Sequence, residues 1–269
     1  MQRQGPGGRI PALDSLRGVL ALVVVVHHVL LRAGSAILQP AADFAILAFF
    51  LMSGLVLARA YDGRPLAFLV RRAVRLWPTY AVCTVAGFAV LGRLPVLGEI
   101  FWLPPIPMQR LGVVNLPAWT LYIEAWATPL LLVFFWIARR GQRLAWLTAA
   151  GSCLLVVLHP RFFSIPVFAV GVALASVKIP WPERLPAWSL WLGKISFSLY
   201  ISHWVVIGAV LRFGGPRLEP LALPLSIGVA WVVWRWVERP SIAWSRRLGG
   251  ARPLVLPPNQ TPESSISVG

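Results

Sequence analysis

The sequence predicts an all-α, polytopic membrane protein with about eight transmembrane helices in one bundle. Apolar residues make up 58% of the 269-residue chain, charged residues only 13%, and the mean hydropathy is +0.72. Soluble domains carry about 25% charged residues, so this composition excludes an ordinary soluble domain. Long apolar runs separated by short Arg-containing loops complete the pattern, which is typical of multi-pass membrane proteins.

Eight apolar runs approach the length that a helix needs to cross a bilayer. We expect transmembrane helices at Leu13–Leu31, Ala42–Ala60, Ala73–Gly92, Ala118–Ala138, Leu144–Leu158, Phe162–Val177, Ile195–Phe213 and Pro220–Val237. Further crossings within the apolar stretch Leu144–Val177 would raise the number to ten.

The basic residues alternate between the two sides of these runs. Eighteen of the 25 Lys and Arg residues lie before the first run, after each even-numbered run, or at the end of the chain. Because basic residues stay in the cytoplasm, this asymmetry predicts cytoplasmic termini and an even number of spans. The net charge of +16 is thereby explained by topology, and we expect no nucleic-acid partner. Arg outnumbers Lys 23 to 2, which is typical of GC-rich coding sequences and favours a bacterial plasma (inner) membrane.

The chain divides into three parts. We expect a cytoplasmic N-terminal segment at 1–12, a transmembrane domain at 13–240 and a cytoplasmic, disordered tail at 241–269 that is rich in Pro and Ser. The first apolar run resembles a signal peptide in its flanks, but its ionisable residues favour a retained helix. Cys83 and Cys153 lie inside predicted spans, where thiols behave as small apolar groups, so we expect neither a disulfide nor a metal site.

The first span carries the strongest functional signal. His28 lies inside an apolar run, where an ionisable group is costly unless it is sheltered and partnered. Arg17 precedes His28 by eleven residues, which places both on nearly the same helix face about 16 Å apart. Asp14 lies three residues before Arg17 and can pair with it. His27 points about 100° away from His28, so we expect it to pack rather than react.

Two further segments carry polar groups near the cytoplasmic border. Ser53 lies before a glycine in the second span, where close helix packing and substrate contact are equally good explanations. Arg72 and Arg75 lie one turn apart at the start of the third span, so they share a helix face. Two guanidiniums so placed can grip a phosphate, although a cluster that only fixes topology fits the sequence equally well.

The fourth and seventh spans supply the remaining candidates. Glu124 is the only acidic residue between Glu99 and Glu183, and we expect a buried carboxylate to pair with His28 or Arg17. Asn115 and Trp119 open the same span. Tyr200 and His203 place a phenol and a second imidazole in the seventh span, and the eighth span ends at Glu238.

These motifs together resemble the membrane-bound acyltransferase-3 family. The resemblance rests on Arg17 and His28, the segment Phe49–Gly54, Arg72 and Arg75 before Pro78 and Tyr80, Trp119–Leu121 with Glu124, Tyr200 with His203, and Glu238 with Pro240. The motifs occur in the family's order from Leu13 to Pro240. Members more often have about ten spans and a longer chain, so this chain resembles a shortened member.

The resemblance implies transfer of an acyl group, often acetyl, from cytoplasmic acyl-CoA to a saccharide, lipid-linked or small-molecule acceptor. In that interpretation His28 is a general base or relay, Glu124 orients it, and Arg17 stabilises negative charge. The resemblance assigns the donor site to Arg72, Arg75, Tyr200, His203 and Ser53, and supporting positions to Asp14, Asn115 and Trp119.

Two other classes compete with an acyltransferase. A proton-coupled transporter or exporter could use the same buried His, Arg and Glu side chains, but the chain lacks paired Gly- or Pro-broken half-helices. A non-catalytic membrane scaffold would leave Arg17, His28 and Glu124 without a reason to be buried. The sequence therefore favours the enzyme.

Overall fold

The computed structural model describes residues 10–101 and 114–248, and helices form all regular secondary structure in these ranges. In chain order they are α1 (Pro11–Arg32), α2 (Gln39–Ala60), α3 (Pro65–Leu91), α4 (Leu97–Ile100), α6 (Ala118–Ala138), α7 (Gln142–Leu158), η1 (Pro160–Phe162), α8 (Ser164–Leu174), α9 (Ala187–Gly214), η2 (Pro216–Leu221), α10 (Ala222–Val233), the π-helical turn η3 (Trp234–Glu238) and α11 (Arg239–Arg247). The predicted all-α class is confirmed.

Within the described residues, six helical segments are long and apolar enough to cross a membrane: α1, α2, α3, α6, α9 and the segment from η2 to α11. Helices α7 and α8 coincide with the fifth and sixth predicted spans, but they have only 17 and 11 residues. The number of eight to ten crossings therefore stays a prediction, while the multi-pass helical architecture is established.

Several helices extend beyond the runs that hydropathy selects. Helix α3 begins at Pro65, eight residues before its predicted start, because proline is well placed in the first helical turn and the arginines that follow interrupt only the apolar run. Helix α9 begins at Ala187, two turns early. The last helix continues to Arg247, past the boundary expected at 240, and residues 249–269 of the predicted tail lie outside the described residues.

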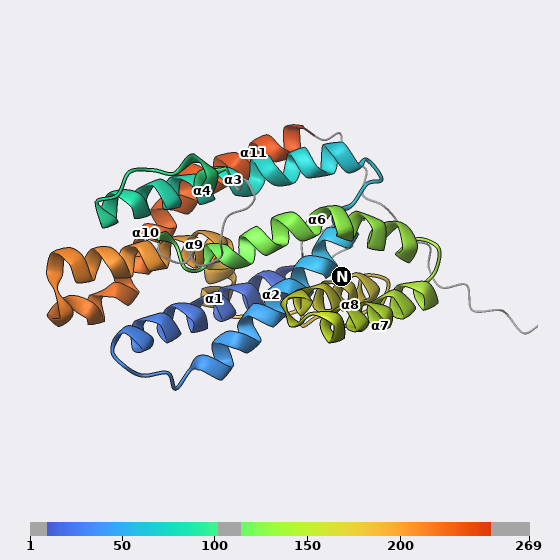
Figure 1. The fold of residues 1–269 in the computed structure, drawn as a ribbon, viewed down its shortest axis with the longest axis horizontal. Coiled ribbons are helices and arrows are strands. Elements are labelled where there is room, and N and C mark those ends of the chain that lie inside the picture. The colour runs from blue at the N-terminus through green and yellow to red at the C-terminus, as the bar shows by residue number, and fades with distance from the viewer. Residues whose placement is uncertain (1–9, 102–113, 249–269) are drawn as a thin grey trace, which may run out of the picture.

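The helices form one bundle whose tightest contacts join segments far apart in sequence. Helix α1 packs along α9, α2 packs along α8, and α10 packs on α9. Helices α3 and α11 lie side by side along the upper edge in Figure 1, and α7 and α8 lie together at the lower right. The predicted site residues lie on five helices: α1, α2, α3, α6 and α9. These helices contact one another directly or through a shared neighbour.

Glycines permit two close helix approaches. A side chain at Gly18 of α1 would place its Cβ 2.5 Å from the backbone nitrogen of Gly193 in α9. A side chain at Gly54 of α2 would meet the carbonyl oxygen of Phe168 in α8. Small residues let helix backbones approach closely in a membrane, where apolar lipid provides no hydrophobic drive for association. The glycine at Gly54 therefore serves packing, while its neighbour Ser53 makes a polar contact described below.

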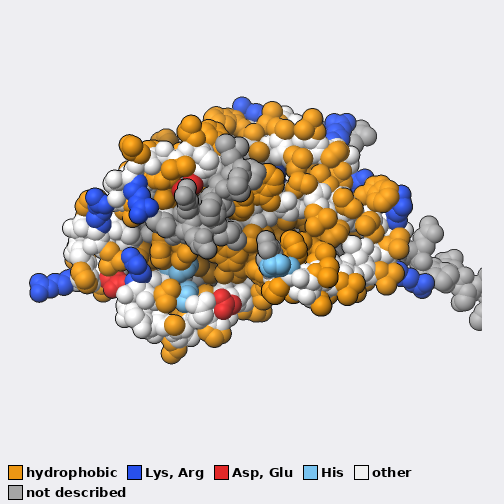
Figure 2. All heavy atoms as spheres, in the orientation of Figure 1, with side chains coloured by type: hydrophobic (Ala, Val, Ile, Leu, Met, Phe, Trp, Pro, Cys, Tyr) orange, Lys and Arg blue, Asp and Glu red, His pale blue; other side chains and the backbone are white. Residues whose placement is uncertain are grey.

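The outer surface is largely apolar. In the face shown in Figure 2, hydrophobic side chains cover the middle, and most Lys and Arg side chains lie toward the two ends of the long axis. Large apolar residues are exposed on several helices, among them Leu154, Val157 and Trp236, with 66%, 82% and 70% exposure. An apolar surface of this extent suits contact with lipid rather than water.

Candidate active site

Two imidazoles from distant parts of the chain meet between α1 and α9. His28 Nδ1 lies 2.9 Å from His203 Nε2, within hydrogen-bond distance. His203 is fully buried, and its Nδ1 lies 3.0 Å from the carbonyl oxygen of Leu199, one turn earlier in α9. His28 is partly exposed and also contacts the ring of Trp204 edge-on. The resemblance assigned His203 to the donor site, and the structure brings it directly against the predicted base.

Tyr200 extends this polar seam from α9 to α6. Its hydroxyl lies 3.0 Å from Thr120 Oγ1, and its ring centroid lies 6.2 Å from that of His203. Phe49 of α2 packs edge-on against the same ring. Glu124 lies four residues after Thr120, so the seam continues along one face of α6 toward the carboxylate.

Glu124 has two polar partners on neighbouring helices. Its Oε1 lies 2.5 Å from Arg72 Nη2 of α3, and it accepts a hydrogen bond from Ser53 Oγ of α2. The side chain of Arg72 is 11% exposed and that of Glu124 is 23% exposed, so this ion pair is largely enclosed. The sequence suggested His28 or Arg17 as the partner of Glu124, and the contact with Arg72 corrects that expectation.

Further charges surround this pair. Arg17 lies 3.6 Å from Asp14, as the three-residue spacing predicts. Arg75 interacts electrostatically with Arg17, Glu238, Arg72 and Asp14. Three guanidiniums and three carboxylates from α1, α3, α6 and η3 thus form one charged cluster.

Glu238 belongs to this cluster, although it is not among the site residues that the sequence predicts. It is 6% exposed, and its Oε2 accepts hydrogen bonds from Ser198 Oγ at 2.5 Å and from the Ser198 backbone N–H at 3.2 Å. It lies in the π-helical turn η3, a form that occurs frequently at functional sites. The available signal was an acidic residue near the end of an apolar run, directly before Arg239 and Pro240.

The two remaining predicted positions make structural contacts. Asn115 is buried and donates from Nδ2 to the carbonyl oxygen of Ile201 at 3.1 Å, which ties the start of α6 to α9. Trp119 packs edge-on against Phe50, with ring centroids 6.4 Å apart. Asn115 thus contacts α9 two residues before His203. The described ring contact of Trp119 is with an apolar side chain.

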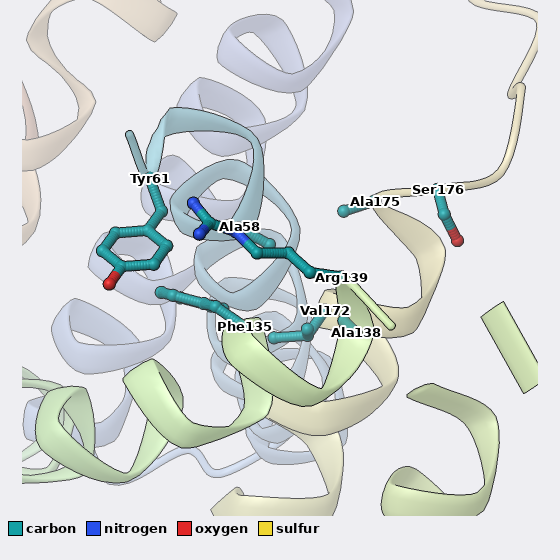
Figure 3. A pocket seen from close by; sticks show the side chains of 8 residues that line it. All are labelled: Ala58, Tyr61, Phe135, Ala138, Arg139, Val172, Ala175 and Ser176. Atoms are coloured by element: carbon teal, nitrogen blue, oxygen red, sulfur yellow. The ribbon is translucent and has the colours of Figure 1, made fainter. Parts of the chain in front are cut away.

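A separate pocket lies where α2, α6 and α8 end, and none of the predicted site residues lines it. Figure 3 shows the guanidinium of Arg139 against the ring of Tyr61, with 4.8 Å between the guanidinium carbon and the ring centroid. In the neighbouring loop, Asp62 pairs with Arg71 at 2.9 Å. Burial opposes ionisation of Asp62, but hydrogen bonds from Arg71 and the Arg64 backbone, with the Arg71 charge, outweigh it and lower its pKa.

Comparison with known proteins identifies the family. Residues 10–176 match the family model described as an acyltransferase domain, Acyl_transf_3. This span exceeds half of the chain, and it contains the predicted site residues that lie on α1, α2, α3 and α6. The chain belongs to this acyltransferase family. It is also 37% identical over 103 residues to "Protein 2 in picA locus" of Rhizobium radiobacter, a match that covers 35% of this chain and 52% of that protein. The chain thus spans about half the length of this relative, and no solved structure matches it.

The geometry gives the site two chemically distinct regions. The imidazole pair can accept and return a proton. The charged cluster can stabilise an anionic group with the guanidiniums of Arg17, Arg72 and Arg75. The phenol of Tyr200 and the hydroxyl of Thr120 lie between these regions along α9 and α6.

Proposed function

We propose that this acyltransferase moves an acyl group, in the simplest case acetyl, from cytoplasmic acyl-CoA to a hydroxyl or amine in the bacterial inner membrane. The acceptor class is a carbohydrate, an envelope component or a lipophilic natural product. One observation carries the proposal: the same face of α1 bears Arg17, within a cluster of guanidiniums, and the partly exposed His28 about 16 Å farther along the helix.

The charged cluster fits the phosphate groups of coenzyme A. Arg75 is exposed, and Arg72 Nε is buried without a hydrogen-bond partner among the described residues. A buried donor without a partner is costly, so an anionic oxygen at this position would satisfy it. Guanidinium groups bind phosphate in a bidentate manner, which Lys cannot do. An extended pantetheine arm is long enough to reach from such a site to His28.

The proposed reaction needs one proton acceptor and no redox chemistry. His28 Nε2 accepts the proton of the acceptor hydroxyl while the hydroxyl oxygen attacks the thioester carbonyl carbon. A carbon–oxygen bond forms, the carbon–sulfur bond breaks, and the electron pair of that bond leaves with sulfur. The proton returns from His28 to the departing thiolate, so the products are the ester and free coenzyme A. Arg17 stabilises negative charge that develops on the donor.

The test measures the donor half of the reaction with the full chain in detergent or nanodiscs. Acetyl-CoA binding is measured by calorimetry. Release of free coenzyme A by hydrolysis, in which water takes the acyl group in place of the acceptor, is followed by chromatography, which avoids interference from Cys83 and Cys153. We expect Arg75→Gln to weaken acetyl-CoA binding by about tenfold. We expect His28→Ala to retain binding and to lower coenzyme A release by about 10²-fold or more.

Matched variants control for charge and for loss of a histidine. Arg143→Gln removes an exposed guanidinium outside the charged cluster, and His159→Ala removes an exposed imidazole at the end of α7. Both are expected to match the wild type. Folded wild-type protein that does not bind acetyl-CoA, or His28→Ala with full coenzyme A release, would overturn the proposal.

A further inference from the structure

We infer that His203 is a positioning residue that holds His28 in its Nδ1-protonated tautomer and so leaves the Nε2 lone pair of His28 free. The tautomer follows from the geometry alone, and its catalytic consequence rests on the function proposed above. A neutral imidazole has one donor and one acceptor nitrogen, and the group bonded to one nitrogen decides which tautomer is present.

The two rings meet edge to edge, as an N–H···N hydrogen bond requires. Their centroids are 5.1 Å apart and their planes differ by 18°. The two bonded nitrogens are only 2.9 Å apart, so each ring centroid lies behind its own nitrogen, nearly on the line that joins the two nitrogens. A face-to-face stack with this centroid distance would leave the nitrogens farther apart. The contact between His28 and His203 is therefore a directed hydrogen bond.

A backbone carbonyl sets the direction of this bond. The carbonyl oxygen of Leu199 can only accept, so His203 Nδ1, at 3.0 Å, must be the protonated donor. In a neutral ring His203 Nε2 is then the acceptor. His28 Nδ1 must therefore carry the proton that it donates to His203.

The surroundings of His203 favour its neutral form. It is fully buried, and its described partners are the carbonyl of Leu199, the neutral ring of His28 and the ring of Tyr200, none of which is negatively charged. A buried imidazolium without an anionic partner is costly in a membrane protein. The nearby groups on α1 do not change this conclusion, because neither of them is an anion. They are His27, whose ring centroid lies 5.2 Å from that of His28, and Arg32, which lies over the ring of Trp204.

The consequence is a free acceptor nitrogen on the exposed side of the pair. Within the described residues, His28 Nε2 has no hydrogen-bond partner, and His28 is the partly exposed member of the pair. The Nδ1-protonated tautomer is the less common one for a neutral histidine side chain in water, so His203 selects the tautomer with a free Nε2. When His28 gains a proton at Nε2, its Nδ1–H continues to donate to His203 and stabilises the cation. An aspartate fulfils this positioning role in serine proteases.

Nitrogen NMR of the full chain tests the tautomer without reference to activity. The protein is labelled with ¹⁵N-histidine in nanodiscs at neutral pH, and His28→Gln assigns the His28 signals among the four histidines. We expect His28 to show a protonated Nδ1 and an unprotonated Nε2. A protonated Nε2 on His28 in the wild type would overturn the inference, even if acyl transfer itself is demonstrated.

Two substitutions separate positioning from packing. His203→Gln keeps an acceptor because its amide oxygen reaches roughly where the imidazole Nε2 lies, whereas His203→Leu offers only an apolar side chain. We expect His203→Leu to shift His28 toward the Nε2-protonated form and to lower kcat on the order of 10²-fold with an unchanged KM for acyl-CoA. We expect His203→Gln to recover most of the wild-type kcat and most of the Nδ1-protonated His28 signal.

A packing role predicts the opposite order. In a fully buried apolar position, leucine is tolerated better than glutamine, whose amide must find partners. Equal or higher kcat for His203→Leu than for His203→Gln, with an unchanged His28 spectrum, would therefore overturn the positioning role. If the wild type shows no acyl transfer but its His28 tautomer is as expected, the failure lies with the proposed reaction and not with the hydrogen-bond geometry. If the wild type transfers the acyl group and neither variant does, the positioning role of His203 is rejected.

Discussion

Glu124 and Arg72 form an enclosed ion pair that joins α6 to α3, with Oε1 and Nη2 separated by 2.5 Å. The same carboxylate accepts a hydrogen bond from Ser53, so one side chain links α2, α3 and α6. Ionic groups in a membrane protein are rarely left unpaired, because the free energy of moving a lone charge out of water is unfavourable. This contact fixes Arg72 within the charged cluster, together with Arg17 and Arg75.

Breaking this ion pair on one side is expected to destabilise the bundle more than removing both charges. Glu124→Gln leaves the largely buried guanidinium of Arg72 without its partner, and we expect a loss of roughly 2 to 4 kcal/mol in unfolding free energy. The double variant Glu124→Gln/Arg72→Gln should lose less than the sum of the two single variants. Thermal unfolding of all four proteins in detergent measures the coupling. Strictly additive shifts in Tm would show that the two side chains do not interact.

The sequence predicts the contents of the site better than its pairing. The spacing of Arg17 and His28 places both on one helix face, and the three-residue spacing of Asp14 and Arg17 predicts their 3.6 Å contact. The partner of His28 lies 175 residues away, and no local pattern encodes which helix it meets. The same holds for Glu124, whose partner depends on how α6 packs against α3 and α2.

The predicted helix boundaries are wrong where hydropathy and backbone geometry disagree. The run of arginines hides the first two turns of α3 from any apolar window, although Pro65 marks the start of the helix. Helix α8 has only 11 residues, so a composition that predicts a span does not fix its length. The glycine contact between α1 and α9 escapes prediction as well, because Gly18 shows its importance only once Gly193 lies against it.

A methyl group at Gly18 is expected to force α1 and α9 apart. In Gly18→Ala the new Cβ lies 2.5 Å from the Gly193 nitrogen and 2.6 Å from the Leu192 carbonyl carbon, and neither backbone atom can rotate away. We expect a loss of about 1 to 3 kcal/mol and, in the NMR spectrum, disturbance of the His28 signals.

Gly151→Ala is the matched control for this variant. Gly151 lies on an exposed face of α7, and a Cβ there meets no atom within 4 Å. Since alanine favours a helix over glycine by roughly 0.5 to 1 kcal/mol, this variant should match or exceed the wild-type Tm. Equal Tm changes in the two variants would contradict close α1–α9 packing.

The ion pair in the α2–α3 loop makes a small, pH-dependent contribution to stability. The pKa of Asp62 is lowered from its ordinary value of 3.8 because hydrogen bonds and the charge of Arg71 outweigh the effect of burial. A lowered pKa in the folded state means that the stabilisation is full above the unfolded pKa and is lost as pH falls through the folded pKa. The difference in Tm between wild type and Asp62→Asn should therefore be constant near neutral pH and shrink below about pH 4.

The size of this difference is also predicted. The side chains of Arg71 and Asp62 are 15% and 6% exposed, so the pair is largely shielded from water, and we expect it to contribute about 1 kcal/mol near neutral pH. Arg71→Gln should remove the same pH dependence, because it removes the group that lowers the Asp62 pKa. A Tm difference for Asp62→Asn that grows as the solution becomes more acidic would have the wrong sign and would reject this explanation.

Ser198 is expected to matter for stability because it supplies both donors that satisfy Glu238. Its hydroxyl and backbone N–H reach the same carboxylate oxygen, and Glu238 is 6% exposed in the π-helical turn. Ser198→Ala removes the shorter of these two bonds and leaves a buried carboxylate under-satisfied, which we expect to cost about 1 to 3 kcal/mol. Ser196→Ala controls for the loss of a buried hydroxyl, since Ser196 bonds only to the Gly193 carbonyl of its own helix and should cost less. If Ser196→Ala lowers the Tm as much as Ser198→Ala does, the bond to Glu238 does not hold the last helix against α9.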